Sequence, residues 1–223
     1  MTQPLEYLAD FCTQHDLPWS AEILAGFQGY LDLLLSFNAS MNLIGPMDEA
    51  RVVDELFIDS LVPAMATPFE AQRVLDVGTG AGLPGIVLAI AHQKAHVTLV
   101  EPRKKRANFM RIAAQRLGLQ GRVQVHQARI EDVPPQTFTR VISKAFAPPV
   151  EWLGIARPWI APEGQILCMT RQSQRLVLEQ RASELGLALV ASASREPESE
   201  DGHTREVYVF DAVGLAAKAE GVA

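Results

Sequence analysis

Apolar residues recur at helical spacing in the first third of the chain, in three series separated by polar residues. The series cover residues 5–12, 23–35 and 52–61. Ser20 stands just before the second series and is a residue type favoured at helix N-termini. Pro63 follows the third series and is expected to end it. The pattern predicts two or three helices over residues 4–66.

From residue 73 onward, short runs rich in β-branched residues alternate with helix-length segments. The predicted strands cover residues 73–77, 95–100, 122–126, 138–143, 165–169, 187–192 and 205–210. The predicted helices cover residues 83–91, 104–117, 150–160 and 172–185. Because strands joined through helices pair in parallel, this order predicts a mostly parallel, doubly wound sheet. Only a charged loop, residues 195–204, separates the last two strands, so we expect them to pair antiparallel.

These elements predict an α/β, Rossmann-like fold with an antiparallel last strand and an N-terminal helical extension. We assign residues 1–70 to the extension, 71–212 to the domain built on the sheet, and 213–223 to a disordered tail. The chain has 2 cysteines, no basic and apolar leader, and no apolar run of 18 residues. We therefore expect a cytoplasmic protein without a membrane span. Nothing in the sequence requires more than a monomer.

The formal net charge of −6 conceals an uneven distribution along the chain. Residues 1–72 hold eleven acidic side chains and one basic one, whereas residues 102–130 hold eight basic side chains and no acidic one. A run of like charges is most often a solvated helix face. Contacts to phosphates, however, require a basic patch and not a basic protein. Residues 102–130 are therefore also a candidate surface for nucleic acid.

The glycine-rich stretch after the first predicted strand is the strongest chemical signal. It reads Val74-Leu75-Asp76-Val77-Gly78-Thr79-Gly80-Ala81-Gly82-Leu83-Pro84-Gly85. Glycines allow a tight turn and a close approach of the backbone to a ligand. A phosphate-binding P-loop would need a Lys after Gly85, where the chain has Ile86. Gly80, Gly82 and Gly85 match a dinucleotide-binding pattern, but they come one turn late, and the Asp76 carboxylate would repel a pyrophosphate.

S-Adenosylmethionine suits this stretch better, because it carries a sulfonium and an ammonium group and no phosphate. Asp76 at the end of the first strand would attract those cations. Glu101 at the end of the second strand could accept hydrogen bonds from both ribose hydroxyls. An ordinary strand–helix turn capped by Asp76 and a nicotinamide dinucleotide site are the alternatives.

The remaining residue types indicate little other chemistry. No catalytic triad or metal-ligand spacing is visible, and the 5 histidines are scattered, so we expect no metal. Cys168 lies in an apolar strand and is interpreted as a packing residue, not a nucleophile. The segment Phe146-Ala147-Pro148-Pro149 predicts a rigid loop where a base could stack on Phe146. Trp152 and Trp159 are predicted to lie in the core.

Short motifs along most of the chain match one known family. They are Asn42-Leu43, Asp59-Ser60-Leu61, the loop from Leu75 to Gly85, Val97-Thr98-Leu99-Val100, Lys105-Arg106 with Phe109, Arg129 with Glu131, and Ile142-Ser143 with Ala145. Through these motifs, the chain resembles the ribosomal RNA small subunit methyltransferase G family, also called glucose-inhibited division protein B, over residues 20–210. The resemblance implies a class I methyltransferase fold, S-adenosylmethionine as methyl donor, and 16S rRNA or the small ribosomal subunit as partner. The implied reaction is methylation of guanine N7.

The resemblance also implies roles for single residues. Gly78 and Leu83 would line the cofactor pocket, and Ile130 and Glu131 would contact the adenine. Lys144 stands where the family usually has Arg, and would act as a positioning residue at the cofactor or substrate mouth. With the residues inferred from the loop, the predicted cofactor-binding set is Asp76, Gly78, Gly80, Gly82, Leu83, Glu101, Ile130, Glu131 and Lys144.

The predicted RNA-binding residues are Arg103, Lys104, Lys105, Arg106 and Arg171. Three departures from the family pattern bear on this surface. Thr170-Arg171 replaces a common Lys-Gly, Asp54-Glu55 stands where a basic pair is frequent, and Ile44 replaces a Thr. We expect all three to lie on the face that meets RNA. A small-molecule methyltransferase, with the acidic helices as a lid, and an NAD-binding oxidoreductase are the alternative functions.

Overall fold

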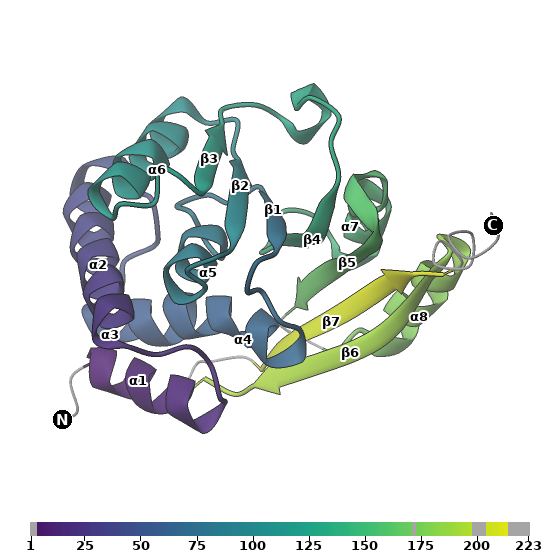
Figure 1. The fold of residues 1–223 in the computed structure, drawn as a ribbon, viewed down its shortest axis with the longest axis horizontal. Coiled ribbons are helices and arrows are strands. Elements are labelled where there is room, and N and C mark those ends of the chain that lie inside the picture. Colours follow the sequence, from purple (N-terminus) through teal and green to yellow (C-terminus); the bar gives the residue numbers. More distant parts are fainter. Residues whose placement is uncertain (1–3, 171–172, 198–203, 214–223) are drawn as a thin grey trace.

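The computed structural model describes residues 4–170, 173–197 and 204–213, which form a seven-stranded sheet covered by helices (Figure 1). The strands are β1 (Arg73–Val77), β2 (His96–Val100), β3 (Val123–His126), β4 (Phe138–Ser143), β5 (Ile160–Thr170), β6 (Leu187–Arg195) and β7 (Arg205–Ala212). Their order is β3-β2-β1-β4-β5-β7-β6. Strands β1 to β5 pair in parallel, and β7 pairs antiparallel with both β5 and β6. The predicted doubly wound sheet with an antiparallel last strand is confirmed.

Helices precede the sheet and connect its strands. They are α1 (Pro4–Gln14), α2 (Ala21–Met41), α3 (Glu49–Val52), the π-helical turn η1 (Val53–Ile58), α4 (Asp59–Ala66), α5 (Gly85–Ala91), α6 (Lys104–Arg116), the short turn η2 (Ile130–Asp132), α7 (Pro149–Ala156), the short turn η3 (Arg157–Trp159) and α8 (Arg175–Glu184). Ser20 caps α2 by accepting a hydrogen bond from the Ile23 N–H at 3.2 Å.

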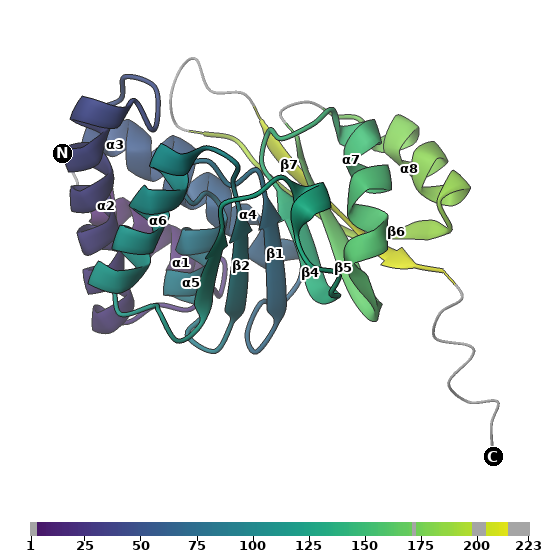
Figure 2. The same ribbon diagram turned by 90° about the horizontal axis from the view of Figure 1, so that it is seen from above.

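Two apolar cores form because side chains alternate across each strand. Val74 of β1 faces the core built from α1 to α6, whereas Leu75 and Val77 face the core built with α7 and α8. Figure 2 shows α2, α5 and α6 on the side away from α7 and α8. The helices of the extension therefore share one continuous core with a face of the sheet. The boundary at residues 70 and 71 stays a prediction.

Two predicted helix ends were wrong. Pro63 lies inside α4, which continues to Ala66, and the Thr67 N–H closes the last turn on the Pro63 carbonyl at 3.2 Å. A proline removes one N–H donor from a helix, yet Pro63 is buried and α4 continues through it. The segment 150–160 is not one helix, because α7 ends at Ala156, turns through η3 and enters β5 at Ile160.

The predicted loop 195–204 begins too early. Arg195 is the last residue of β6, and it is the register partner of Arg205 at the start of β7. Both arginines are buried and make ion pairs, so their charge does not place them in a solvated loop. The predicted tail lies outside the described residues except for Val213. Within the described residues, no helix is long and apolar enough to span a membrane.

The extension braces the glycine-rich loop through one buried tyrosine. Tyr30 of α2 stacks on Phe57 of η1, with ring centroids 5.2 Å apart and an interplanar angle of 6°. Its hydroxyl donates a hydrogen bond to the carbonyl of Ala81 at 2.8 Å. This contact joins residues 51 positions apart in the sequence and fixes the middle of the loop.

Replacing Tyr30 by Phe keeps the ring and removes this donor. The Ala81 carbonyl then loses its partner, which costs roughly 1–3 kcal/mol. We expect a lower melting temperature and several-fold weaker S-adenosylmethionine binding, measured by calorimetry. Tyr7→Phe is the matched control, because the Tyr7 hydroxyl contacts Arg195 at 3.3 Å and not the loop. Equal losses of affinity in both variants would contradict a role in bracing the loop.

Candidate functional site

Strand ends bring the predicted site residues together at one edge of the sheet. Gly78 follows β1, Glu101 follows β2 and Lys144 follows β4. The register pairs Val77 with Val100, so the ends of β1 and β2 are level. Ligands of open parallel sheets bind outside the carboxyl ends of the strands, so this edge is the candidate site.

Asp76, near the end of β1, fixes the glycine-rich loop through two hydrogen bonds. Its carboxylate is fully buried, and Oδ2 accepts hydrogen bonds from the Thr79 hydroxyl at 2.5 Å and the Gly85 N–H at 2.8 Å. A Cβ atom on Gly85 would lie 2.2 Å from a methyl carbon of Leu99 and 2.8 Å from this oxygen. The close approach of α5 to Asp76 therefore requires a glycine at position 85.

The second oxygen of Asp76 is available to a cation or to a hydrogen-bond donor of a ligand. Oδ1 is buried and has no hydrogen-bond partner among the described residues. Burial raises the pKa of Asp76 to about 7, against the lowering effects of its hydrogen bonds to Thr79 and Gly85. A cation beside this oxygen would stabilise the ionised carboxylate.

Glu101 is fixed at the mouth of the loop. Its Oε2 accepts from the Gly80 N–H at 3.2 Å, and its Oε1 accepts from the Arg103 N–H at 2.9 Å. The Arg106 guanidinium lies 3.9 Å from Oε2. The side chain of Arg106 thus points toward the loop, and its predicted contact with RNA stays a prediction.

The backbone of the loop needs its glycines, and one aromatic ring covers it. Gly78, Gly80 and Gly82 have φ values of +69°, +63° and +99°, a region that other residues rarely adopt. A Cβ on Gly78 would lie 2.4 Å from the ring of Phe146. Phe146 is 39% exposed and packs edge-on against the buried Trp152, with centroids 6.1 Å apart. Stacking of a base on Phe146 stays a prediction.

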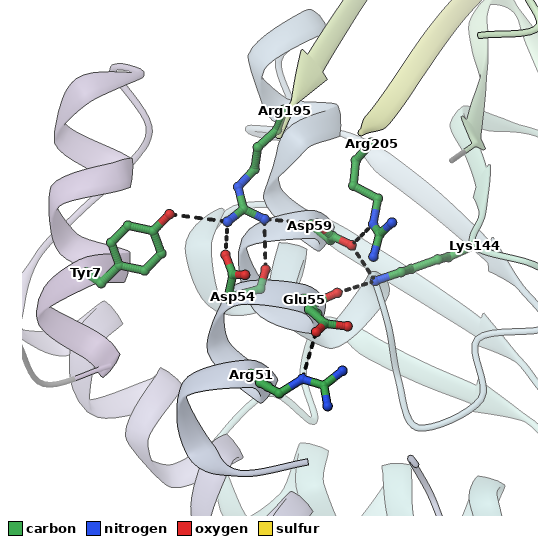
Figure 3. Close-up of polar contacts among 8 residues, drawn as sticks. All are labelled: Tyr7, Arg51, Asp54, Glu55, Asp59, Lys144, Arg195 and Arg205. Carbon is green, nitrogen blue, oxygen red and sulfur yellow. Dashed lines mark hydrogen bonds and ion pairs between the residues drawn. The ribbon is translucent and has the colours of Figure 1, made fainter. Parts of the chain in front are cut away.

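An ion cluster lies beside this edge, between η1–α4 and the β6–β7 hairpin (Figure 3). Its members are Asp54, Asp59, Lys144, Arg195 and Arg205. Arg195 pairs with both carboxylates, and Arg205 pairs with Asp59. Our expectation that Asp54 lies on the RNA face was wrong, because Asp54 is buried and bound by Arg195.

The other predicted residues differ in burial, and one of them lies outside the described residues. Leu83 and Ile130 are buried, whereas Glu131 is exposed on η2. Arg171 lies outside the described residues. Cys168 is buried, and burial raises the pKa of its thiol to about 12, consistent with a packing role.

The sequence analysis missed three residues that hold the loop or the ion cluster: Tyr30, whose hydroxyl binds the loop, and the buried Arg195 and Arg205 of the cluster. An arginine at each facing end of two apolar strands was the available signal for the last two. Asp59 was noted only as part of a motif. Within the described residues, no group of three His, Cys, Asp or Glu side chains could hold a metal ion.

The residues at this edge fit S-adenosylmethionine. The orphaned Oδ1 of Asp76 suits a cationic or donor group, and the fixed carboxylate of Glu101 suits ribose hydroxyls. Gly78 and Gly80 would let the ligand approach the backbone. A pyrophosphate would meet both carboxylates, which disfavours the dinucleotide alternative.

The pKa of Asp76 predicts a pH dependence of binding. In the free protein the carboxyl group loses its proton near pH 7, and the sulfonium cation favours the ionised form. The affinity for S-adenosylmethionine relative to S-adenosylhomocysteine, which lacks the sulfonium charge, should therefore rise between pH 6 and 8. The rise is at most about tenfold per pH unit. Calorimetric titration of both ligands measures this ratio. A ratio that changes equally with pH in Asp76→Asn would refute the assignment.

Comparison with known proteins identifies the family. The family model described as rRNA small subunit methyltransferase G matches residues 23–196. A relative of that name from Halorhodospira halophila is 34% identical over 187 residues, covering 84% of this chain and 86% of the relative. One from Myxococcus xanthus is 33% identical over 212 residues, covering 92% and 95%.

Solved structures at lower identity share the fold. M. jannaschii TYW2 in complex with AdoMet has a TM-score of 0.57 at 17% identity, covering 72% of this chain and 76% of that one. The O-methyltransferase from Bacillus cereus in complex with SAH has a TM-score of 0.56 at 18% identity, covering 82% and 90%. With a family match over most of its length and relatives at this identity, the chain belongs to the rRNA small subunit methyltransferase G family.

Proposed function

We propose that this protein transfers a methyl group from S-adenosylmethionine to N7 of a guanine in 16S rRNA. One observation carries the proposal: in a chain of a methyltransferase family, the glycine-rich loop binds Asp76 and Glu101 at the carboxyl edge of the sheet. When bound, S-adenosylmethionine supplies an activated methyl group on its sulfonium. Asp76, Glu101 and the glycine backbone would bind and orient it, and Lys144 would act as a positioning residue at the mouth.

The chemistry of guanine N7 suits a site without a general base. N7 carries a free lone pair and no proton, so nothing needs to be removed before methyl transfer. The protein then contributes by orienting the two reactants and by excluding water. Asp76 and Glu101 are both buried and engaged by loop N–H groups, which suits a role in binding.

The start of α6 supports an RNA-binding surface beside the loop. Arg103, Lys104 and Lys105 are exposed, and only Pro102 separates them from Glu101. The first turn of α6 carries no acidic residue. Cations at a helix N-terminus are unfavourable with the helix dipole, and a bound phosphate would offset that cost. The proposed partner is the small ribosomal subunit or its 16S rRNA, met by a monomer in the cytoplasm.

The function is tested on small subunits and on naked 16S rRNA from a strain lacking the gene. Radiolabelled S-adenosylmethionine is added, and the label is mapped to the nucleotide and the atom. We expect one N7-methylguanosine, and comparing the two RNA forms identifies the substrate. Subunits from the parent strain are the control and should accept no label. Label on another atom, or only on small metabolites, contradicts the proposal.

Removing the charges at the start of α6 tests the RNA surface. RNA binding should weaken in a triple variant that combines Arg103→Ala, Lys104→Ala and Lys105→Ala. The slope of the logarithm of RNA affinity against the logarithm of salt concentration should decrease in magnitude by about 2. S-Adenosylmethionine affinity should not change. Arg175→Ala with Arg181→Ala on α8 is the control, because α8 lies on the other face of the sheet. An unchanged salt slope in the triple variant would exclude this surface.

A further inference from the structure

Lys144 lies between the methyl-donor loop and a neighbouring cavity. It directly follows β4, which pairs with β1 in a register that places Ile142 beside Asp76. Burial raises the pKa of Asp76 and the charge of Lys144 opposes that rise, so the two groups interact electrostatically. On its other side Lys144 borders a cavity of about 200 Å³, whose lining includes Ala145, Pro149, Met169 and Arg205.

Contacts to Glu55 and Asp59 hold the Lys144 ammonium in the ion cluster (Figure 3). Its Nζ donates to the main-chain carbonyl of Glu55 at 3.1 Å and lies 3.6 Å from Oδ2 of Asp59. The side chain of Lys144 is 20% exposed, whereas that of Asp59 is 0% exposed. Lys144, which follows β4 at the carboxyl edge of the sheet, is thus the most exposed side chain of the cluster, and Asp59 is its buried support.

Asp59 is itself fixed by two arginines from the far end of the chain. Oδ1 accepts from Nη1 of Arg195 at 3.1 Å, and Oδ2 accepts from Nε of Arg205. A buried carboxylate with two guanidinium partners has little freedom to move. The β6–β7 hairpin therefore fixes the position of the Asp59 carboxylate, and through it the position of the Lys144 ammonium.

We propose that Asp59 is a positioning residue of the methyl-transfer site, acting by holding the ammonium group of Lys144 beside the donor loop and the cavity. The inference rests on the proposed function and names a residue that supports it from outside the site. It predicts that substitution of Asp59 lowers kcat/KM for methyl transfer because Lys144 is displaced, and that it has no further effect when Lys144 is absent.

Asp54 provides a matched control in the same cluster. It is buried and paired with Arg195 and, in the described contacts, does not reach Lys144. Asp54→Asn and Asp59→Asn each remove one buried charge. The first takes an ion pair from Arg195, and the second takes one each from Arg195 and Arg205. Both should lower the melting temperature, so a purely structural role would reduce methyl transfer in each variant in proportion to its loss of melting temperature.

The test is a double-mutant cycle on Asp59→Asn and Lys144→Ala, read as kcat/KM for methyl transfer to small subunits. We expect each single variant to lose at least tenfold, and the double variant to fall within twofold of Lys144→Ala. Asp54→Asn should stay within twofold of the wild type. Multiplied losses in the double variant, or equal losses in Asp54→Asn and Asp59→Asn, overturn the proposal.

A second measurement does not depend on activity. The rate at which an acylating reagent modifies Lys144 is followed by mass spectrometry, and it should rise at least fivefold in Asp59→Asn and not in Asp54→Asn. An unchanged rate in Asp59→Asn overturns the positioning role. If the wild type transfers no methyl group to rRNA, the proposed function fails, and this rate still decides the coupling of Asp59 to Lys144. If Asp59→Asn does not fold, Asp59→Glu, which moves the charge by one methylene, is held to the same two readouts.

Discussion

Asp76 is fully buried, and the loop at the carboxyl end of β1 is folded around it. One oxygen binds the hydroxyl of Thr79 and the N–H of Gly85, which lie on either side of the turn. The turn can close this tightly only because position 85 has no side chain. The same carboxylate leaves its other oxygen without a partner. A buried charge that both shapes a loop and lacks one partner is costly in the free protein, and a cationic ligand relieves that cost.

The helices ahead of the sheet contribute to the site as well as to the core. Tyr30 reaches the loop from α2, and η1 with α4 supplies the carboxylates that meet the β6–β7 hairpin. Each contact joins parts of the chain that are far apart in sequence. The acidic character of the N-terminal region therefore has an internal use, since Asp54 and Asp59 neutralise arginines that would otherwise be buried alone.

Charge is sorted by burial around the carboxyl edge of the sheet. Arg195 and Arg205 are buried and paired, while Arg103, Lys104 and Lys105 are exposed beside Glu101. The buried set is neutralised by Asp54 and Asp59, and the exposed set is available to a polyanion. This division explains how a chain with a net charge of −6 can present a basic surface next to the loop.

The sequence by itself determined the succession of strands and helices along the chain, the glycine loop, and the carboxylates at the ends of β1 and β2. It could do so because periodicity and turn chemistry are local properties. It failed at Pro63 and Arg195, where a local rule assigned a helix end and a loop, and at Asp54, where the family resemblance implied an RNA-facing charge. In each case burial against a distant segment outweighed that expectation. Only the tertiary structure decided that Arg195 meets Asp54 across 141 positions and that Asp59 lies beside Lys144. Such pairs are energetically favourable only after the core has excluded water, and no pattern along the chain records which charges will be enclosed together.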